Sequence, residues 1–265
     1  MKIAIIGNGA IAQFVQKELA TRSHDICALI LRPERIDQIP PESRASLTLV
    51  SGVEALPDGI DHVIDCAGHA GLAQHGVAIL RAGYDLTTLA IGALADQEFA
   101  SKLGEAAHAG SSRLFLASGA IGGLDCLRAA NVGQLSSVRY VGRKPPLGWR
   151  GSPAEQKLDL ENLRTSAETH FQGSAREAAL AYPKNANVAA AIALAGLGFE
   201  DTEVELIADP TISTNIHEIA ASGQFGDLNV RISGAALPDN PRSSALAAMS
   251  VVSTIEQQCA VFVGC

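Results

Sequence analysis

Short apolar runs alternate with stretches of helical spacing up to about Ser118. The first run, Lys2–Ile6, is β-branched, and the short apolar runs predict strands at Lys2–Ile6, Ile26–Leu31, His62–Cys66, Asp85–Leu89 and Arg113–Ala117. Between them, apolar residues at helical spacing predict helices at Ala10–Ala20, Ala70–Ala82 and Asp96–Ala109. This alternation indicates a doubly wound α/β domain, in which helices cover both faces of a parallel sheet.

The pattern changes after this point. Strand-like segments without regular strand–helix spacing occur at Ser137–Val141, Thr202–Ala208, His217–Ala221 and Leu228–Ile232, with an alanine-rich helix at Ala186–Ala195. This favours a second domain of the α+β class. The final stretch, Ser243–Val261, is typical of a mostly apolar helix, and we expect it to pack back onto the first domain. The expected domains are 1–118 plus 242–265, and 119–241, with a mobile loop at Gly148–Pro153.

Composition and charge narrow the classes of function. A chain of 265 residues has room for about two domains of roughly 150 residues, and 47% hydrophobic residues argue against disorder. Only 4% of the residues are aromatic and the formal net charge is −8. We therefore expect neither nucleic acid nor a membrane surface as a partner.

The cysteines and the lengths of the apolar runs bear on the cellular compartment and on metal binding. The five cysteines are scattered without a CxxC pair, which indicates neither a disulfide framework nor a zinc site, so no metal is expected. The apolar start at Lys2–Ile6 is too short for a signal peptide. The longest apolar run, Val188–Phe199, is shorter than the roughly 18 residues of a membrane span. A cytoplasmic protein is the expectation.

A glycine motif follows the first strand and opens the first helix. Gly7-Asn8-Gly9-Ala10-Ile11-Ala12 fits the G-x-G-x-x-G/A fingerprint of a Rossmann dinucleotide-binding domain. Gly7 would permit the tight turn and Gly9 would let the backbone approach a pyrophosphate, while the N–H groups of the helix N-terminus, at Ala10 and Ile11, would bind the phosphate. The alternative is a glycine turn without a ligand.

The coenzyme is usually selected about 20 residues further on, where an acidic side chain binds the ribose of NAD. Here the residue is Arg32, followed by Pro33-Glu34-Arg35. A guanidinium suits the 2′-phosphate of NADP, so both NAD and NADP stay open as cofactors. Alternatively, Arg32 stacks on adenine or lies in solvent.

Seven further motifs carry a resemblance to a known family. They are Cys66-Ala67-Gly68-His69-Ala70-Gly71, Ile91-Gly92-Ala93-Leu94-Ala95-Asp96, Ser118-Gly119-Ala120-Ile121-Gly122-Gly123-Leu124-Asp125, Gly142-Arg143-Lys144-Pro145-Pro146, Tyr182-Pro183-Lys184-Asn185-Ala186-Asn187-Val188-Ala189, Asn215-Ile216-His217-Glu218 and Asn240-Pro241-Arg242-Ser243-Ser244. Their order resembles that in the L-aspartate dehydrogenases. The resemblance implies a Rossmann domain, an α+β domain for substrate and dimer contacts, and NAD(P)-dependent oxidative deamination of L-aspartate to iminoaspartate, which water converts to oxaloacetate and ammonia.

His217 is similar to the catalytic histidine of that family. An unperturbed imidazole, with a pKa near ~6.5, would exchange protons around neutral pH while the amine becomes an imine. Without the motif, a polar strand residue facing solvent would be the simpler interpretation. Glu218 would point to the opposite face of the strand, so it is not expected to orient His217.

The resemblance also implies cofactor contacts for Ala120 and Asn187. Asn187 has helix capping as an alternative role, because asparagine is a preferred cap. Ala67 and Gly68 end the third strand, where dinucleotide domains place the ligand crevice, and we expect cofactor contacts there too.

A dicarboxylate substrate needs cations. Arg143, Lys144 and Arg242 are the candidates, with Ser243 and Ser244 as hydroxyl donors. An ordinary charged surface turn is the alternative for Arg143 and Lys144. Since the net charge of −8 would repel both substrate and coenzyme, the positive charge must be local.

The predicted function is that of an NAD(P)-dependent L-aspartate dehydrogenase, a homodimer that feeds NAD biosynthesis. A homoserine dehydrogenase or a dihydrodipicolinate reductase-like enzyme would share the first domain and is the alternative among enzymes. A non-catalytic dinucleotide sensor is the alternative from another class, because a fold does not fix a function.

Overall fold

A computed structural model describes residues 1–39, 47–183, 185–238 and 240–262, without the side chains of Pro241 and Arg242. The chain divides into two compact units. Within the described residues, unit 1 combines Met1–Ala117 with 248–262, and unit 2 runs from Ser118 to Ala247. Each unit is described by itself below.

Unit 1 is built on a six-stranded parallel sheet with the order β3-β2-β1-β4-β5-β6. Its strands are β1 (Lys2–Ile6), β2 (Asp25–Ile30), β3 (Thr48–Val50), β4 (His62–Asp65), β5 (Asp85–Thr88) and β6 (Leu114–Leu116). The strand order reverses between β1 and β4, and ligands of open α/β sheets bind outside the carboxyl ends of the strands at this point.

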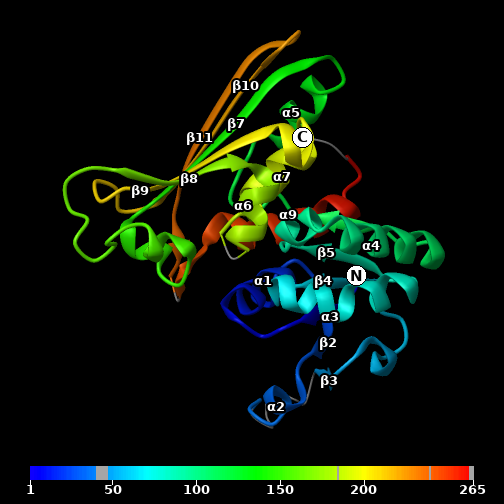
Figure 1. Ribbon diagram of the computed structural model, residues 1–265. Helices are drawn as coiled ribbons and strands as arrows, with labels where there is room; N and C mark the ends of the chain where they lie inside the picture. The colour runs from blue at the N-terminus through cyan, green and yellow to red at the C-terminus, as the bar shows by residue number, and fades with distance from the viewer. Residues whose placement is uncertain (40–46, 184, 239, 263–265) are drawn as a thin grey trace. The chain divides into compact units, whose positions relative to one another are not determined.

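Helices cover the sheet of unit 1 and complete two apolar cores. They are α1 (Ala10–Ala20), α2 (Pro33–Ile36), α3 (Gly68–Arg81), α4 (Gln97–Gly110) and α9 (Ala245–Cys259). One core joins β-strand residues to Leu72 and Ile79 of α3 and Leu103 of α4. The other core joins Val15 of α1 to Ile255 of α9, so the terminal helix packs within unit 1 (Figure 1).

The doubly wound parallel sheet predicted from the alternation is confirmed. Its first strand and first helix have the predicted bounds, and the others differ by one or two residues. The sequence pattern missed β3 and α2, because three and four residues are too few to show a period.

Unit 2 contains a mixed five-stranded sheet with the order β11-β10-β7-β9-β8. Its strands are β7 (Leu135–Lys144), β8 (Glu168–Ser174), β9 (Thr202–Ala208), β10 (Asn215–Gly223) and β11 (Gly226–Gly234). Strands β7 and β9 are parallel and the other pairs are antiparallel. The long strands β7, β10 and β11 run side by side (Figure 1), and a second domain of the α+β class is thereby confirmed.

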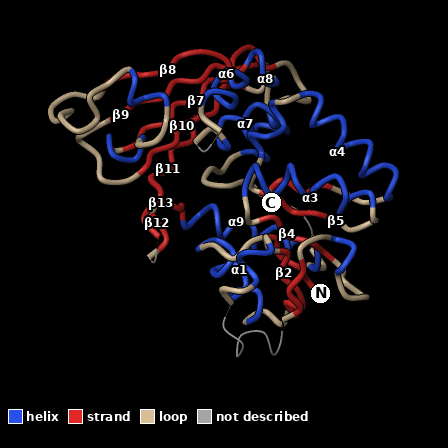
Figure 2. Tube along the Cα trace, turned by 60° about the horizontal axis from the view of Figure 1, so that its bottom comes forward, coloured by secondary structure: helices blue, strands red, loops and turns tan. Residues whose placement is uncertain are grey.

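The remaining elements of unit 2 lie around this sheet. They are α5 (Leu124–Ala130), α6 (Ala175–Ala181), α7 (Asn187–Ala195), α8 (Gly198–Asp201), the 3₁₀ helices η4 (Pro146–Trp149) and η5 (Pro153–Gln156), and the short strands β12 (Ala236–Leu237) and β13 (Asn240–Ser244), which pair with each other. Helices α6, α7 and α8 pack together beside β8 and β9 (Figure 2). Accordingly, Val138 and Tyr140 of β7 are buried whereas Arg139 between them is exposed.

The expectation of a mobile loop at Gly148–Pro153 is wrong at its centre. Trp149 is only 1% exposed, and its indole N–H donates to the carbonyl of Ile207 at 3.0 Å. A buried indole with a satisfied N–H anchors this segment to the sheet. Among the helices that the structure describes, none is long and apolar enough to cross a membrane.

Candidate active site

The turn after β1 is shaped by its glycines. Gly7 has a φ of +93°, which favours glycine, and a Cβ there would lie 3.3 Å from the Cβ of Ala67. The turn after β1 therefore lies directly beside the turn after β4. Gly9 caps α1, and a Cβ on Gly9 would meet nothing within 4 Å.

The N-terminus of α1 is suited to an anion. Ala10 and Ile11 begin the helix, and its first turn holds no acidic residue. Ala12 is fully buried against the sheet, which brings the helix close to the strands. Free N–H groups, the positive end of the helix and open space beside Gly9 together fit the pyrophosphate of a dinucleotide.

Asp65 holds the turn that follows β4. It is fully buried at the end of β4, where one carboxylate oxygen accepts the N–H of Ala67 at 2.9 Å and the other accepts the hydroxyl of Thr88 at 2.8 Å. Burial raises the pKa of Asp65 to about 6, although these bonds act in the opposite direction. Gly68 follows with a φ of +73° and begins α3, so the turn of Ala67 and Gly68 is fixed from below by Asp65.

Arg32 lies at the end of β2 and caps α2. Its side chain is 62% exposed, and its Nε lies 3.6 Å from a carboxylate oxygen of Glu34. An exposed pair of this length is weak, so the guanidinium can turn to another anion.

His217 and Tyr140 meet on the buried face of the sheet in unit 2. His217 on β10 is paired with Gly142 on β7, so its side chain shares a face with Tyr140, Gly142 and Lys144. The hydroxyl of Tyr140 lies 2.7 Å from Nδ1 of His217. Burial and, secondly, the positive charge of Lys144 lower the pKa of His217 to about 4. The ring therefore stays neutral from pH 7 down to about pH 5, whereas the unperturbed imidazole that we expected from the sequence would exchange protons around neutral pH.

Lys144 is the cation on this face. Its ammonium group donates to Oδ1 of Asn185 at 2.8 Å and lies 4.7 Å from the ring centroid of Trp149. Burial lowers the pKa of Lys144 to about 8. None of the described carboxylates forms an ion pair with it, which leaves its charge available to an anionic ligand.

Arg143 lies on the opposite face. It pairs with Asp209 at 3.7 Å and with Glu218 at 3.4 Å, and Glu218 also pairs with Arg231 at 3.1 Å. The structure thus brings Lys144 to His217 and does not bring Arg143 there. Glu218 is on the face that the strand alternation predicts for it.

The other predicted contacts are spread over unit 2. Ala120 is 8% exposed and follows Gly119, which has a φ of +74°. Asn187 is the first residue of α7, and the cap is Ala186, so the capping role considered for Asn187 is wrong. Ser243 is half-buried in β13, while the side chain of Arg242 is outside the described part of the chain.

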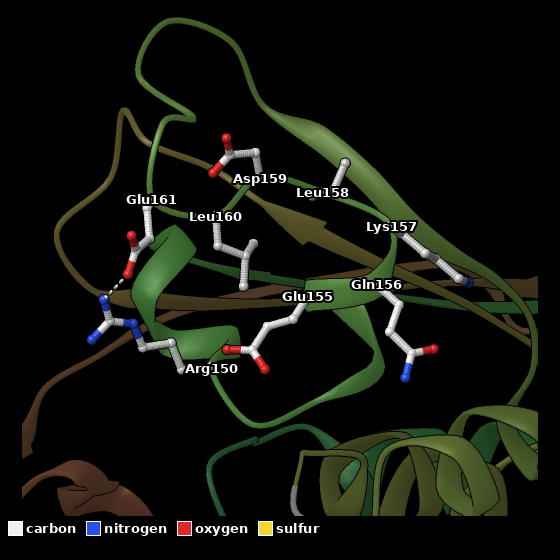
Figure 3. A pocket seen from close by; sticks show the side chains of 8 residues that line it. All are labelled: Arg150, Glu155, Gln156, Lys157, Leu158, Asp159, Leu160 and Glu161. Carbon is white, nitrogen blue, oxygen red and sulfur yellow. Dashed lines mark hydrogen bonds and ion pairs between the residues drawn. The ribbon is translucent and has the colours of Figure 1, made fainter.

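A separate hollow on the surface of unit 2 contains none of the predicted site residues (Figure 3). It is lined by Arg150, Glu155, Gln156, Lys157, Leu158, Asp159, Leu160 and Glu161. Arg150 forms an ion pair with Glu161 at 2.7 Å. Three carboxylates around the hollow make it unsuitable for a dicarboxylate.

Several site residues were missed by reasoning from the sequence. Asp65, Tyr140, Trp149 and Asn185 had no assigned role. Tyr140 had a detectable signal, since it stands two residues before the Gly142 motif and hence on the same strand face. Its neighbour His217 is 77 residues away, and no local pattern gives the register that joins them.

A parallel sheet whose strand order reverses beside a glycine turn, followed by a domain with a buried histidine, is typical of two-domain dehydrogenases of the nicotinamide-dinucleotide class. The family models agree on both parts. Residues 6–117 match the NAD-binding domain of homoserine dehydrogenase, and residues 125–258 match the C-terminal domain of aspartate dehydrogenase.

Individual relatives extend this match to nearly the whole chain. It is 51% identical to L-aspartate dehydrogenase of Ruegeria pomeroyi, over 97% of this chain and 92% of that protein. It is 46% identical to L-aspartate dehydrogenase of a Polaromonas species, over 95% of both chains. The crystal structure of aspartate dehydrogenase from Thermotoga maritima superimposes with a TM-score of 0.76 at 25% identity, over 100% of this chain and 99% of that one. The chain belongs to the L-aspartate dehydrogenase family.

Proposed function

We propose that the protein oxidises L-aspartate with NAD or NADP, giving iminoaspartate and then oxaloacetate and ammonia. The observation that carries this proposal is Lys144 beside His217, a cation without an ion-pair partner among the described carboxylates, in a unit that matches the C-terminal domain of aspartate dehydrogenase. A dicarboxylate substrate supplies the missing negative charge.

The two units have separate tasks in this proposal. Unit 1 is the dinucleotide-binding domain, and unit 2, to which residues 242–247 belong, binds the substrate. The coenzyme is held by the turns at Gly7, Gly9, Ala67 and Gly68 and by the start of α1, with Arg32 at the ribose. When bound, it accepts a hydride from the α-carbon of L-aspartate.

On the substrate side, Lys144 binds a carboxylate and His217 contacts the reacting amine or imine. Ala120 and Asn187 contact the coenzyme, as the resemblance implies. Arg242 and Ser243 are proposed for the second carboxylate, whereas Arg143 already has two acidic partners and is the weaker candidate.

A spectrophotometric assay of coenzyme reduction tests this function. Purified protein is mixed with L-aspartate, D-aspartate, L-glutamate or L-homoserine and with each coenzyme at alkaline pH, and reduced nicotinamide is followed by absorbance. We expect a rate with L-aspartate that exceeds the others. A faster rate with L-homoserine would favour the homoserine dehydrogenase alternative, and no rate with L-aspartate would refute the proposal.

The variant Lys144→Met tests in the same assay whether the charge of Lys144 binds the substrate. Removing the charge should raise KM for L-aspartate by about tenfold or more, the value of one charge-assisted hydrogen bond. Lys157→Met removes another lysine of unit 2, which donates to the carbonyl of His170 at 2.8 Å, and should leave KM unchanged. Equal KM values in the wild type and Lys144→Met would remove Lys144 from the site.

A homodimer and a cytoplasmic role in NAD biosynthesis are also proposed. The resemblance to the L-aspartate dehydrogenases, which implies dimer contacts in the second domain, supports the dimer. Light scattering after size exclusion tests the dimer, and a monomer mass would refute it. Failure of the gene to support growth of a strain that lacks its own source of iminoaspartate would refute the biosynthetic role.

A further inference from the structure

Tyr140 has a contact that the assigned roles do not use. Its hydroxyl lies 2.7 Å from Nδ1 of His217, and the two rings are nearly parallel, with an interplanar angle of 12° and centroids 6.0 Å apart. Tyr140 is 1% exposed. The contact is therefore a buried hydrogen bond between two strands, β7 and β10, and not a surface encounter.

Gly142 makes the room for this contact. A Cβ at Gly142 would lie 2.7 Å from the hydroxyl oxygen of Tyr140 and 3.1 Å from its Cζ. The Tyr140 side chain thus lies across Gly142 toward His217, which is the pairing partner of Gly142. Any larger residue at this position would displace the hydroxyl. Gly142 is therefore needed for the space it leaves to the Tyr140 side chain and not for a turn of the backbone.

The direction of the hydrogen bond follows from the burial of the hydroxyl. Among the described residues, Nδ1 of His217 is the one partner of the Tyr140 hydroxyl. Burial raises the pKa of Tyr140, so the hydroxyl keeps its proton. A buried O–H without an acceptor is costly, and the proton must point to Nδ1. A neutral imidazole carries one proton, which then resides on Nε2.

We propose that Tyr140 is a positioning residue that holds neutral His217 in the tautomer with its proton on Nε2, so that the ring presents an N–H donor and not a proton acceptor to the substrate. The inference rests on the proposed role of His217 in the site. A neutral histidine in this form polarises a substrate oxygen or nitrogen by hydrogen bonding. The ammonium proton of L-aspartate must then leave to another group before hydride transfer.

Unit 2 contains a second tyrosine–histidine pair that serves as a control. The hydroxyl of Tyr182 lies 3.1 Å from Nδ1 of His170, so the chemistry is the same. However, Nε2 of His170 is buried and has no partner among the described residues, whereas Nε2 of His217 is not among the buried unpartnered atoms. Nε2 of His170 is therefore enclosed by protein, whereas Nε2 of His217 can meet a ligand.

Nitrogen NMR of the protein labelled with ¹⁵N-histidine tests the proposal without turnover. Two-bond proton–nitrogen correlations show which ring nitrogen is protonated, and the His217 signals are assigned from their loss in His217→Gln. In the wild type at pH 7 we expect His217 protonated on Nε2. In Tyr140→Phe both tautomers should appear, and kcat with L-aspartate should fall by about tenfold, the value of one lost hydrogen bond, with coenzyme affinity unchanged.

Two controls keep the result specific. Tyr182→Phe should leave the His217 signals as in the wild type. If Tyr140→Phe does not fold, Gly142→Ala displaces the same hydroxyl, with Gly234→Ala on β11 as its match, because a Cβ there meets only an ordinary contact at 3.8 Å. Protonation of Nδ1 in the wild type, or a tautomer unchanged in Tyr140→Phe, would overturn the proposal. Because the NMR signals need no substrate, this failure is separate from a failure to oxidise L-aspartate.

Discussion

The two units provide their chemistry in different ways. In unit 1 the groups proposed to bind the coenzyme belong to the backbone, namely the N–H groups at the start of α1, beside the open space at Gly9. In unit 2 they are side chains, with His217, Tyr140 and Lys144 on one face of a sheet. A site built from backbone groups loses its function when an added side chain blocks it, whereas a site built from side chains loses its function when one of them is removed. Substitutions in the two units should therefore affect different steps.

The largest effect is expected for His217→Ala. Loss of a polar group that contacts the reacting centre should lower kcat by about 10²–10³-fold. Coenzyme affinity, measured by isothermal titration calorimetry with the coenzyme, should remain that of the wild type. His108→Ala, at an exposed position in α4, should change neither quantity. A near-normal kcat in His217→Ala would show that unit 2 does not act through this side chain.

Gly9→Val should show the opposite behaviour. Since a Cβ at Gly9 meets no atom within 4 Å, the variant should fold normally, but its side chain fills the space that a pyrophosphate would need. The coenzyme Kd should rise by about tenfold or more, the value of one hydrogen bond to a charged group. Gly104→Val adds a side chain at another open position of unit 1 and serves as the control. Unchanged coenzyme affinity in Gly9→Val would place the dinucleotide elsewhere.

A smaller effect is expected for Arg32, the side chain of unit 1 that we propose to lie at the coenzyme ribose. Arg32→Ala should lower the ratio of kcat/KM for NADP to that for NAD by roughly tenfold, if the guanidinium binds the 2′-phosphate. Arg35→Ala is the matched control, because Arg35 is also in α2 and donates to Gln38 at 2.9 Å. An equal ratio in wild type and Arg32→Ala would mean that coenzyme choice is made by other groups.

The same contrast explains which features the sequence could predict. The strand, turn and helix at Lys2–Ala20 are contiguous, so the spacing of apolar residues and two glycines was sufficient to define them. Arg32 followed from its place after the second strand. In unit 1, only Asp65 escaped notice, because its task is to hold a backbone turn and no motif describes that.

In unit 2 the site depends on strand register. Tyr140 and Lys144 meet His217 because β7 pairs with β10 across more than 70 residues of sequence. Arg143 and Lys144 are adjacent in the sequence and were both proposed as cations, but alternation along β7 sends them to opposite faces. The burial that lowers the pKa of His217 is also a tertiary property, which a motif cannot show.

The smallest expected effect concerns acid stability. Burial lowers the pKa of His170 and His217 in unit 2 to about 4, from 6.5 in the unfolded chain. As the pH falls below 6.5, the unfolded chain binds protons that the folded unit does not, and the free energy of unfolding decreases by about 1.4 kcal/mol per histidine and pH unit. In unit 1, His62 and His75 act in the same direction, but Asp65 opposes them. Its raised pKa, about 6, favours the folded state between pH 6 and 4.

Unit 2 should therefore unfold at a higher pH than unit 1. Trp149 is the single tryptophan of the chain and lies in unit 2, so its fluorescence reports that unit alone, whereas far-UV circular dichroism reports both. During acid titration the change in Trp149 fluorescence should occur at a higher pH than the loss of circular dichroism. His170→Gln should bring the two transition pH values closer together, because the unfolded chain then binds one proton fewer than in the wild type. If the two signals changed at the same pH, the two units would unfold as one cooperative unit. The difference between the units would then concern their sites and not their stability.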